Sequence, residues 1–213
     1  MFRLFAAALL IAMAAFTANA QTIDFEDAPA TVACEWGGGA IYDQYRGLTW
    51  TGFRPLSLTN YNTVCNPSHG SGYQSLPSSL GEYIAIGFGT SEIHSDTPFL
   101  LTGFDYGTGW NNGTLLVEGF YENVWTPIKT FDLTLNSNKS YSGNVQVTGL
   151  RFIPTWNPGT QIAGADYGGT PYNTFYVDNI TVTTVPEPSS MTLILLGIAG
   201  FVSARIFRKI ING

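Results

Sequence analysis

Side chains able to carry out catalysis are few in this sequence of 213 residues, which contains only two histidines, His69 and His94. Both lie in polar, loop-like contexts. The sequence has no Gly-x-Ser-x-Gly nucleophile elbow, no His-Glu-x-x-His zinc motif and no phosphate-binding glycine loop. Acidic residues are plentiful, but a glycosidase needs two carboxyl groups about 5 or about 9 Å apart, and spacing along the chain does not predict such a distance. These observations favour a protein that is not an enzyme.

Tryptophans beside Gly- and Asn-rich turns provide chemistry for contact with a carbohydrate. An aromatic face packs against the C–H groups of a sugar, and neighbouring Asn, Asp or Gln side chains supply hydrogen bonds. Trp110 in Gly-Trp-Asn-Asn-Gly and Trp156 in Thr-Trp-Asn-Pro-Gly are therefore expected at the surface as carbohydrate contacts. Trp50 and Trp125 lie in strand-like segments and are expected in the core. The alternative is that all these aromatics belong to the core and edges of a β-sheet protein.

The N-terminal 20 residues have the composition of a secretory signal peptide. Arg3 supplies a positive charge, Leu4–Phe16 is apolar, and Ala18-Asn19-Ala20 offers small residues for cleavage. The chain is therefore expected to be exported.

Two cysteines, Cys34 and Cys65, lie in the part of the chain that would be exported. An oxidising compartment favours a disulfide between them, and closing a loop of this length contributes roughly 3–4 kcal/mol in the chain-entropy model. The alternative is a pair of buried free thiols.

The C-terminal region has three parts in succession. The segment Val185-Pro186-Glu187-Pro188-Ser189-Ser190 contains two prolines that favour a stiff, extended backbone. A short apolar stretch, Met191–Ala204, follows it. The chain then ends in a basic tail containing Arg205, Arg208 and Lys209.

In this order and spacing, the three parts closely resemble the PEP-CTERM sorting signal of Gram-negative bacteria. The resemblance implies that Pro186, Glu187 and Pro188 direct the chain to exosortase, a membrane-embedded processing enzyme. It also implies a short transmembrane sorting helix, transient residence in the inner membrane, and then a place at the cell surface or in the extracellular matrix. The alternative is an ordinary C-terminal membrane anchor. The predicted organisation is a signal peptide at 1–20, one domain at 21–185 and the sorting signal at 186–213.

The predicted domain at 21–185 contains 14 acidic and five basic residues, a net charge of −9. An acidic surface repels phosphate backbones, so nucleic acid is not an expected partner. Alternating apolar residues between Gly-, Asn-, Pro- and Ser-rich turns predict an all-β fold, an antiparallel β-sandwich of the jelly-roll type. Asn111-Asn112-Gly113 and Glu122-Asn123 are predicted hairpin turns. The predicted strands are Thr22–Glu26, Gly47–Phe53, Tyr83–Phe88, Phe99–Tyr106, Thr114–Tyr121, Trp125–Leu135, Val145–Ile153 and Thr174–Thr183.

This domain also resembles galactose-binding-like jelly rolls, through its opening strand Ile23-Asp24-Phe25-Glu26 and its closing strand Phe175–Val182. The resemblance implies a structural calcium ion held by Glu26 or Asp27 together with Asp178, and hard oxygen ligands suit calcium. The alternative is that these acids only point outward from strands or cap turns.

The expected function is that of an exported, exosortase-sorted cell-surface protein that is not an enzyme and that associates with exopolysaccharide or biofilm matrix, or binds glycans. One alternative is a hydrolase or lyase that acts on surface glycans. A purely structural surface component is another. The expected partners are exosortase and extracellular polysaccharide.

In a host that contains exosortase, the surface-exposed protein is expected to lack the segment beyond the Pro-Glu-Pro motif, because the signal is removed during sorting. Intact-mass measurement of the exposed form checks this. Replacing Glu187 is expected to leave the protein in the inner membrane. Detection of Arg205–Gly213 on the exposed form would contradict the prediction.

Overall fold

The computed structural model describes residues 20–28, 44–58, 80–159 and 174–185, together with residues 76, 166–167, 170–171, 197–198 and 201. The chain divides into two units, of which one is Ala20–Thr183 and the other combines Met1–Asn19 with Thr184–Gly213. No helix in the described part of the chain is long and apolar enough to cross a membrane. Apart from Ala20, the predicted signal peptide lies outside the described residues, and so does nearly all of the predicted sorting helix.

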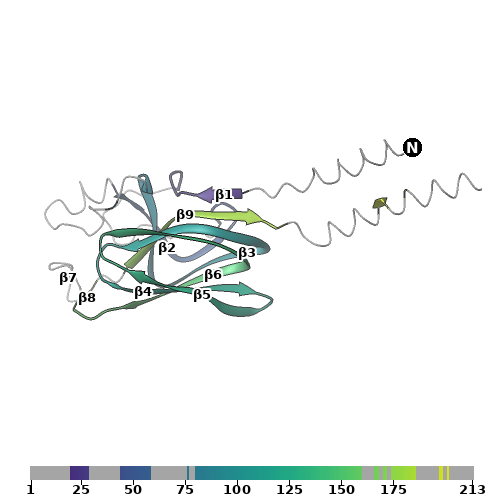
Figure 1. The fold of residues 1–213 in the computed structure, drawn as a ribbon. Helices are drawn as coiled ribbons and strands as arrows, with labels where there is room; N and C mark the ends of the chain where they lie inside the picture. The colour runs from purple at the N-terminus through teal and green to yellow at the C-terminus, as the bar shows by residue number, and fades with distance from the viewer. Residues whose placement is uncertain are drawn as a thin grey trace, which may run out of the picture. The chain divides into compact units, whose positions relative to one another are not determined.

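Antiparallel β-strands form most of the described part of the unit Ala20–Thr183 (Figure 1). They are β1 (Ala20–Ile23), β2 (Thr49–Ser57), β3 (Tyr83–Thr108), β4 (Gly113–Tyr121), β5 (Val124–Leu133), β6 (Ser137–Trp156), β7 (Asp166–Tyr167), β8 (Thr170–Pro171) and β9 (Thr174–Thr184).

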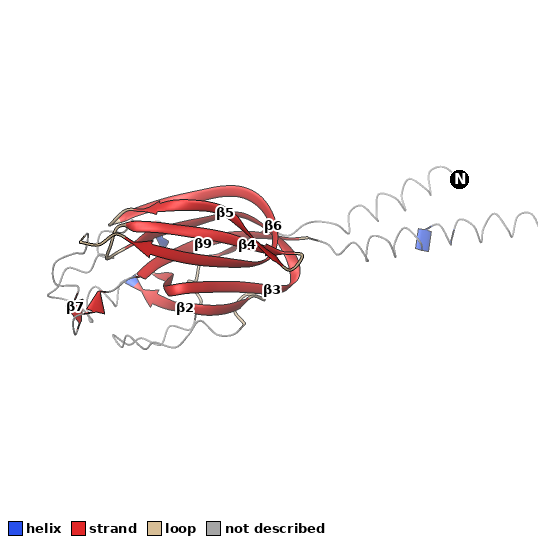
Figure 2. Cartoon of the chain, turned by 90° about the horizontal axis from the view of Figure 1, so that it is seen from below, coloured by secondary structure: helices blue, strands red, loops and turns tan. Residues whose placement is uncertain are grey.

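The main sheet has seven strands in the order β1-β9-β3-β6-β4-β5, with β2 paired to β3, while β7 and β8 form a separate small sheet. Figure 2 shows the strands stacked in two layers. Two long strands make this possible, because β3 spans 26 residues and β6 spans 20. Their ladder shifts register between His94 and Phe99 and again between Leu101 and Gly103, where extra residues bend the strands. The predicted antiparallel β-sandwich is confirmed.

An aromatic cluster fills the space between the layers. The ring of Phe152 on β6 lies 5.6 Å from that of Phe53 on β2, 5.8 Å from Phe104 on β3 and 6.0 Å from Phe175 on β9. Most of these pairs meet edge to face, an arrangement favoured by the ring quadrupoles. Gly87 permits the close approach, because a Cβ atom at this position would lie 2.3 Å from the Phe175 ring. Four strands are thus joined by one set of side chains.

Two details of the strand prediction are wrong. The segments predicted as separate strands, Tyr83–Phe88 and Phe99–Tyr106, belong to the single strand β3. The residues between them continue the strand because the bend is made by a register shift and not by a loop. Similarly, β6 begins at Ser137, eight residues before the predicted start at Val145.

The two predicted hairpin turns have different outcomes. Glu122 and Asn123 connect the paired strands β4 and β5, and both have positive φ angles, 50° and 65°, as a two-residue hairpin turn requires. Asn111-Asn112-Gly113 is not a hairpin, because β4 pairs with β5 and β6 and not with β3. Asn112 instead accepts a hydrogen bond from the backbone N–H of Leu135, at 2.7 Å. This bond joins the connection between β3 and β4 to the connection between β5 and β6.

Replacing Phe152 with alanine is expected to lower the free energy of unfolding by about 3–5 kcal/mol, because it leaves a cavity among three aromatic rings. Thr130→Ala, at an exposed position on β5, serves as the control and should change stability by less than about 1 kcal/mol. Urea unfolding of the two variants checks the difference. Equal midpoints would show that Phe152 is not central to the packing.

Candidate functional site

The two tryptophans predicted as carbohydrate contacts, Trp110 and Trp156, are not exposed at the surface. Trp110 is only 3 % exposed and packs in a second buried cluster with Ile84, Ile86 and Tyr176. Its expected surface position is therefore wrong, because these apolar side chains cover the indole. Trp156 is half-buried at the end of β6 and packs against the main core cluster.

Of the two tryptophans expected in the core, only Trp50 is buried there. Trp50 is buried as expected, with 2 % of its surface exposed. Trp125 is not in the core, because it is half-buried and lies among polar and aromatic side chains of neighbouring strands. Its ring centroid is 4.9 Å from that of Phe120 and 5.8 Å from that of His94.

Strand register brings six side chains together on this face, and we call them the aromatic platform: Glu92 and His94 on β3, Glu118 and Phe120 on β4, Trp125 on β5 and Arg151 on β6. The platform has two neighbouring rows. In the first row, Arg151 lies opposite Glu92 on one side and Glu118 on the other. In the second row, Gly149 lies between His94 and Phe120, and Trp125 lies opposite Phe120.

Charged contacts hold the platform side chains in place. Both Nε and Nη2 of Arg151 donate to Oε2 of Glu118, at 2.8 and 2.5 Å. The same guanidinium lies over the Trp125 ring, 4.2 Å from its centroid, in a cation–π contact. His94 Nε2 lies 2.9 Å from Oε2 of Glu92. The indole of Trp125 is therefore supported on one face by a guanidinium that is itself anchored.

Gly149 provides room for the His94 ring. A Cβ atom at position 149 would lie 2.8 Å from Nδ1 of His94 and 3.2 Å from its Cε1. The imidazole thus lies directly over the glycine, and its ring meets Phe120 and Trp125 edge-on, at 6.4 and 5.8 Å.

Sequence reasoning missed the platform, although a weak signal was present. Its residues recur at intervals of two along three strands, as Glu92 and His94, Glu118 and Phe120, and Gly149 and Arg151. That spacing places both members of each pair on one face of a strand. The signal does not show which strands are neighbours, so the six side chains could not be combined.

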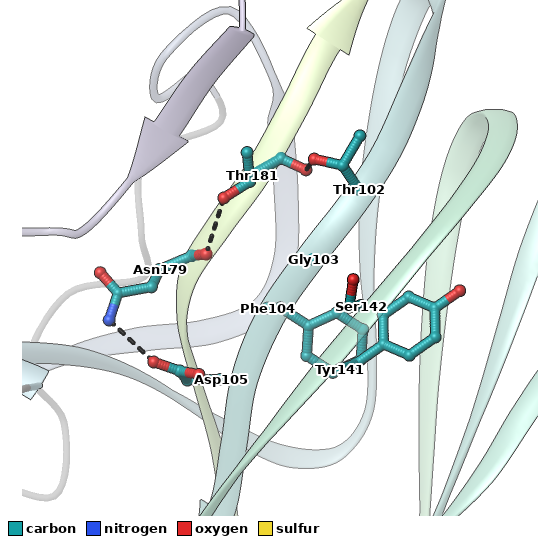
Figure 3. A pocket seen from close by; sticks show the side chains of 8 residues that line it. All are labelled: Thr102, Gly103, Phe104, Asp105, Tyr141, Ser142, Asn179 and Thr181. Atoms are coloured by element: carbon teal, nitrogen blue, oxygen red, sulfur yellow. Dashed lines mark hydrogen bonds between the residues drawn. The ribbon is translucent and has the colours of Figure 1, made fainter.

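A shallow hollow of about 420 Å³ lies over β3, β6 and β9 (Figure 3). Asp105 accepts hydrogen bonds from the Ser140 hydroxyl, at 2.5 Å, and from the Asn179 amide, at 2.9 Å. Both of its carboxylate oxygens are thus occupied. The hollow is lined by Thr102, Gly103, Phe104, Asp105, Tyr141, Ser142, Asn179 and Thr181.

Asp178, next to this hollow in sequence, is fully buried, and its Oδ1 has no hydrogen-bond partner in the structure. Burial raises the pKa of this carboxyl to about 8, with further increases from the negative charges of Asp105, Glu26 and Asp24. A backbone hydrogen bond from Asn179 lowers it in part. The Asp178 carboxyl is therefore protonated at neutral pH unless a cation compensates its charge.

The predicted calcium ligands are not assembled into one set. Asp27 accepts from the Tyr45 hydroxyl at 2.5 Å and from Arg46 Nη2 at 2.6 Å, and the Tyr45 hydrogen bond is the main cause of its lowered pKa. Glu26 Oε1 accepts the backbone N–H groups of Glu82 and Tyr83. Within the described ranges, no three His, Cys, Asp or Glu side chains lie close enough to hold a metal ion together. Only the free Oδ1 of Asp178 fits the expectation, so calcium binding stays a prediction.

Other predicted positions cannot be placed. The sorting motif Pro186, Glu187 and Pro188 and the two cysteines, Cys34 and Cys65, lie outside the described residues.

Solved structures similar to this chain include carbohydrate-binding modules and glycosidases. The family 32 module of NanJ from C. perfringens, in complex with galactose, has 8 % identity and a TM-score of 0.33, with 63 % of this chain and 98 % of that chain covered. CBM32-3 from a family 31 glycoside hydrolase of Clostridium perfringens has 12 % identity and a TM-score of 0.33, with coverages of 64 % and 91 %.

The GH29 fucosidase E1_10125 of Ruminococcus gnavus, in complex with fucose, has 9 % identity and a TM-score of 0.35, with 68 % of this chain but only 26 % of that chain covered. Similarity at this level does not bear on function. No curated protein sequence matches the chain.

The match that identifies part of the chain is at its C-terminus. Residues 184–209 match the family described as the PEP-CTERM protein-sorting motif. The predicted sorting signal is confirmed, and the chain carries the signal of exported proteins that exosortase sorts at the membrane.

The raised pKa of Asp178 predicts a specific pH dependence of stability. The folded protein holds a proton that the unfolded chain releases between pH 3.8, the ordinary value, and about pH 8. The free energy of unfolding should therefore fall as pH rises through this window, by up to about 1.4 kcal/mol per pH unit. Asp178→Asn, which is uncharged, should lose most of this fall and be more stable than the original chain at pH 8.

Melting temperatures measured from pH 5 to pH 8 in a chelator check this prediction. Parallel curves for the two proteins would contradict it. Calcium added at pH 8 separately tests the ion, because bound calcium should stabilise the original chain and not the Asp178→Asn variant.

Proposed function

We propose that the unit Ala20–Thr183 is a glycan-binding module, without enzymatic activity, of an exported cell-surface protein. One observation carries the proposal. Trp125, Phe120 and His94 form a contiguous aromatic surface, and hydrogen-bonding groups of Glu92, Glu118 and Arg151 lie beside it.

The chemistry of the platform matches that of a sugar. A pyranose ring presents C–H groups that pack on an aromatic face and hydroxyl groups that need hydrogen-bond partners at its edge. Arg151 supports one face of the indole at 4.2 Å and is itself held by Glu118. An aromatic side chain that is already fixed loses little conformational freedom when a ligand stacks on its other face.

The position of the platform favours a polymer. The four strands that carry it, β3, β6, β4 and β5, are neighbours in the sheet, and their spacing gives a width of roughly 14 Å. A sheet face of this width has room for several sugar rings of an extended chain. The sorting signal at residues 184–209 supports a role for this surface outside the cell, in contact with exopolysaccharide or biofilm matrix.

Cleavage of a bound glycan, by hydrolysis or by lyase-type elimination, is the alternative activity of the same face. Glu92 and Glu118 are half-buried carboxylates in one row, but Arg151 lies between them and pairs with Glu118. This pairing favours a binding role, since a glycosidase leaves the space between its two carboxyl groups to the scissile bond. Release of new reducing ends or unsaturated products from a bound polymer would indicate an enzyme.

Trp125→Ala is expected to weaken glycan binding by about tenfold or more, because burial of a large aromatic face contributes roughly 1.5–3 kcal/mol. The test uses the full-length chain in a detergent without a sugar headgroup and a panel of neutral and charged oligosaccharides, measured by calorimetry. Val124→Ala is the matched control, since Val124 is 59 % exposed on the same hairpin and points to the other side of β5. Equal loss in both variants, or binding by neither the original nor the variant chain, would overturn the proposal.

A further inference from the structure

We infer that the aromatic platform selects a cationic glycan, a polymer of amino sugars with free amines. This inference rests on the proposed function and adds the charge class of the ligand. It follows from how each charged group of the platform is engaged.

The one permanent cation of the platform, Arg151, has its charge compensated within the platform. Its Nε and Nη2 both bond to Glu118 Oε2, and its flat face is covered by the Trp125 ring. A uronic acid at the remaining N–H groups of Arg151 would lie beside Glu118 and Glu92, which stand opposite the arginine on its two sides. Repulsion by these two carboxylates opposes binding of a carboxylate ligand.

The carboxylates of Glu92 and Glu118, in contrast, each keep one oxygen that can accept a hydrogen bond from a ligand. Glu118 uses Oε2 for Arg151, and Glu92 uses Oε2 for His94. No hydrogen bond within the described part of the chain involves Oε1 of either residue. The side chains are 14 % and 30 % exposed, so the carboxylates are partly shielded from water. An ammonium group binding at such a site would form a charge-assisted hydrogen bond that is weakly screened.

The distances between the rows fit a sugar amine. Along each strand, the acidic row is two residues from the aromatic row, which is about 7 Å. Glu92 precedes His94 and Glu118 precedes Phe120 by this interval. A ring stacked on the aromatic row thus places its substituents within reach of the acidic row.

Long-range charge acts in the same direction. The segment 21–185 has a net charge of −9, which attracts a polycation and repels a polyanion. Basic side chains of the described residues are also occupied: Arg46 pairs with Asp27, and Lys139 donates to the Asp132 carbonyl and the Thr134 hydroxyl. Arg54 and Lys129 lie over the rings of Phe88 and Phe131.

The test compares four soluble probes with the full-length chain in a detergent without a sugar headgroup, at about pH 6, where sugar amines are protonated. The probes are a glucosamine oligosaccharide, its fully N-acetylated form, a galacturonate oligosaccharide of equal length, and a short polylysine as a cation that is not a sugar. The glucosamine oligosaccharide should bind at least tenfold more tightly than the other three. Glu92→Gln should weaken it by about tenfold, the effect of losing one charged hydrogen bond.

Glu122→Gln is the matched control, because it removes the same charge from an exposed turn outside the platform, and it should change binding by less than about twofold. Equal binding of the acetylated form, with no effect of Glu92→Gln, would overturn the charge selectivity and leave the proposed function intact. Preferred binding of galacturonate would also overturn the charge selectivity and leave the proposed function intact. Equal binding of polylysine and glucosamine, insensitive to Trp125→Ala, would show only general attraction to an acidic protein and overturn the inference. If no sugar binds, the proposed function fails as well.

Discussion

Contact of Phe152 with Phe53, Phe104 and Phe175 joins four strands in one packed cluster, and much of the described structure depends on it. Side chains alternate between the two faces of a strand, so burying Phe152 turns Arg151 outward. A slip of one residue along β6 would bury the arginine and expose the phenylalanine. The core therefore fixes the outer surface, and the position of Arg151 under Trp125 is a consequence of aromatic packing on the opposite face.

Local patterns predicted the class of fold but not the arrangement of its surface. Period-two alternation identified most strands, and the predicted Glu122-Asn123 turn is confirmed by two positive φ angles between the paired strands β4 and β5. The strand β3 was divided in error, since a β-bulge and a loop have similar compositions. Trp110 was misplaced because its Gly- and Asn-rich surroundings are typical of surface turns, whereas this connection is enclosed by Ile84, Ile86 and Tyr176. The platform combines residues that lie as far apart in the sequence as Glu92 and Arg151. They come together only because of the order of the strands in the sheet, which local sequence patterns do not reveal.

Two shielded carboxyl groups of the same domain, those of Glu118 and Asp178, differ in whether a cation compensates their negative charge. Glu118 is half-buried beside a guanidinium, and this contact offsets the cost of removing its charge from water. Asp178 is fully buried among other acids, and burial favours its neutral form. The first arrangement orients an indole at the surface. The second makes a strand near the end of the chain sensitive to pH.

Pairing of β1 with β9, in which Ala20 lies opposite Thr183, has a mechanical consequence. The sorting segment continues directly from the end of β9, so a force applied through that segment enters the domain at Thr184. Figure 1 shows β1 alongside β9, and the sheet order places β3 on the other side of β9. Tension therefore acts on a strand that pairs with β1 along Ile180–Thr183 and with β3 on its other edge, so pulling it out requires two ladders to break. An outermost strand could be peeled away one bond at a time, whereas a force applied at Thr184 meets a strand that has a neighbour on each side.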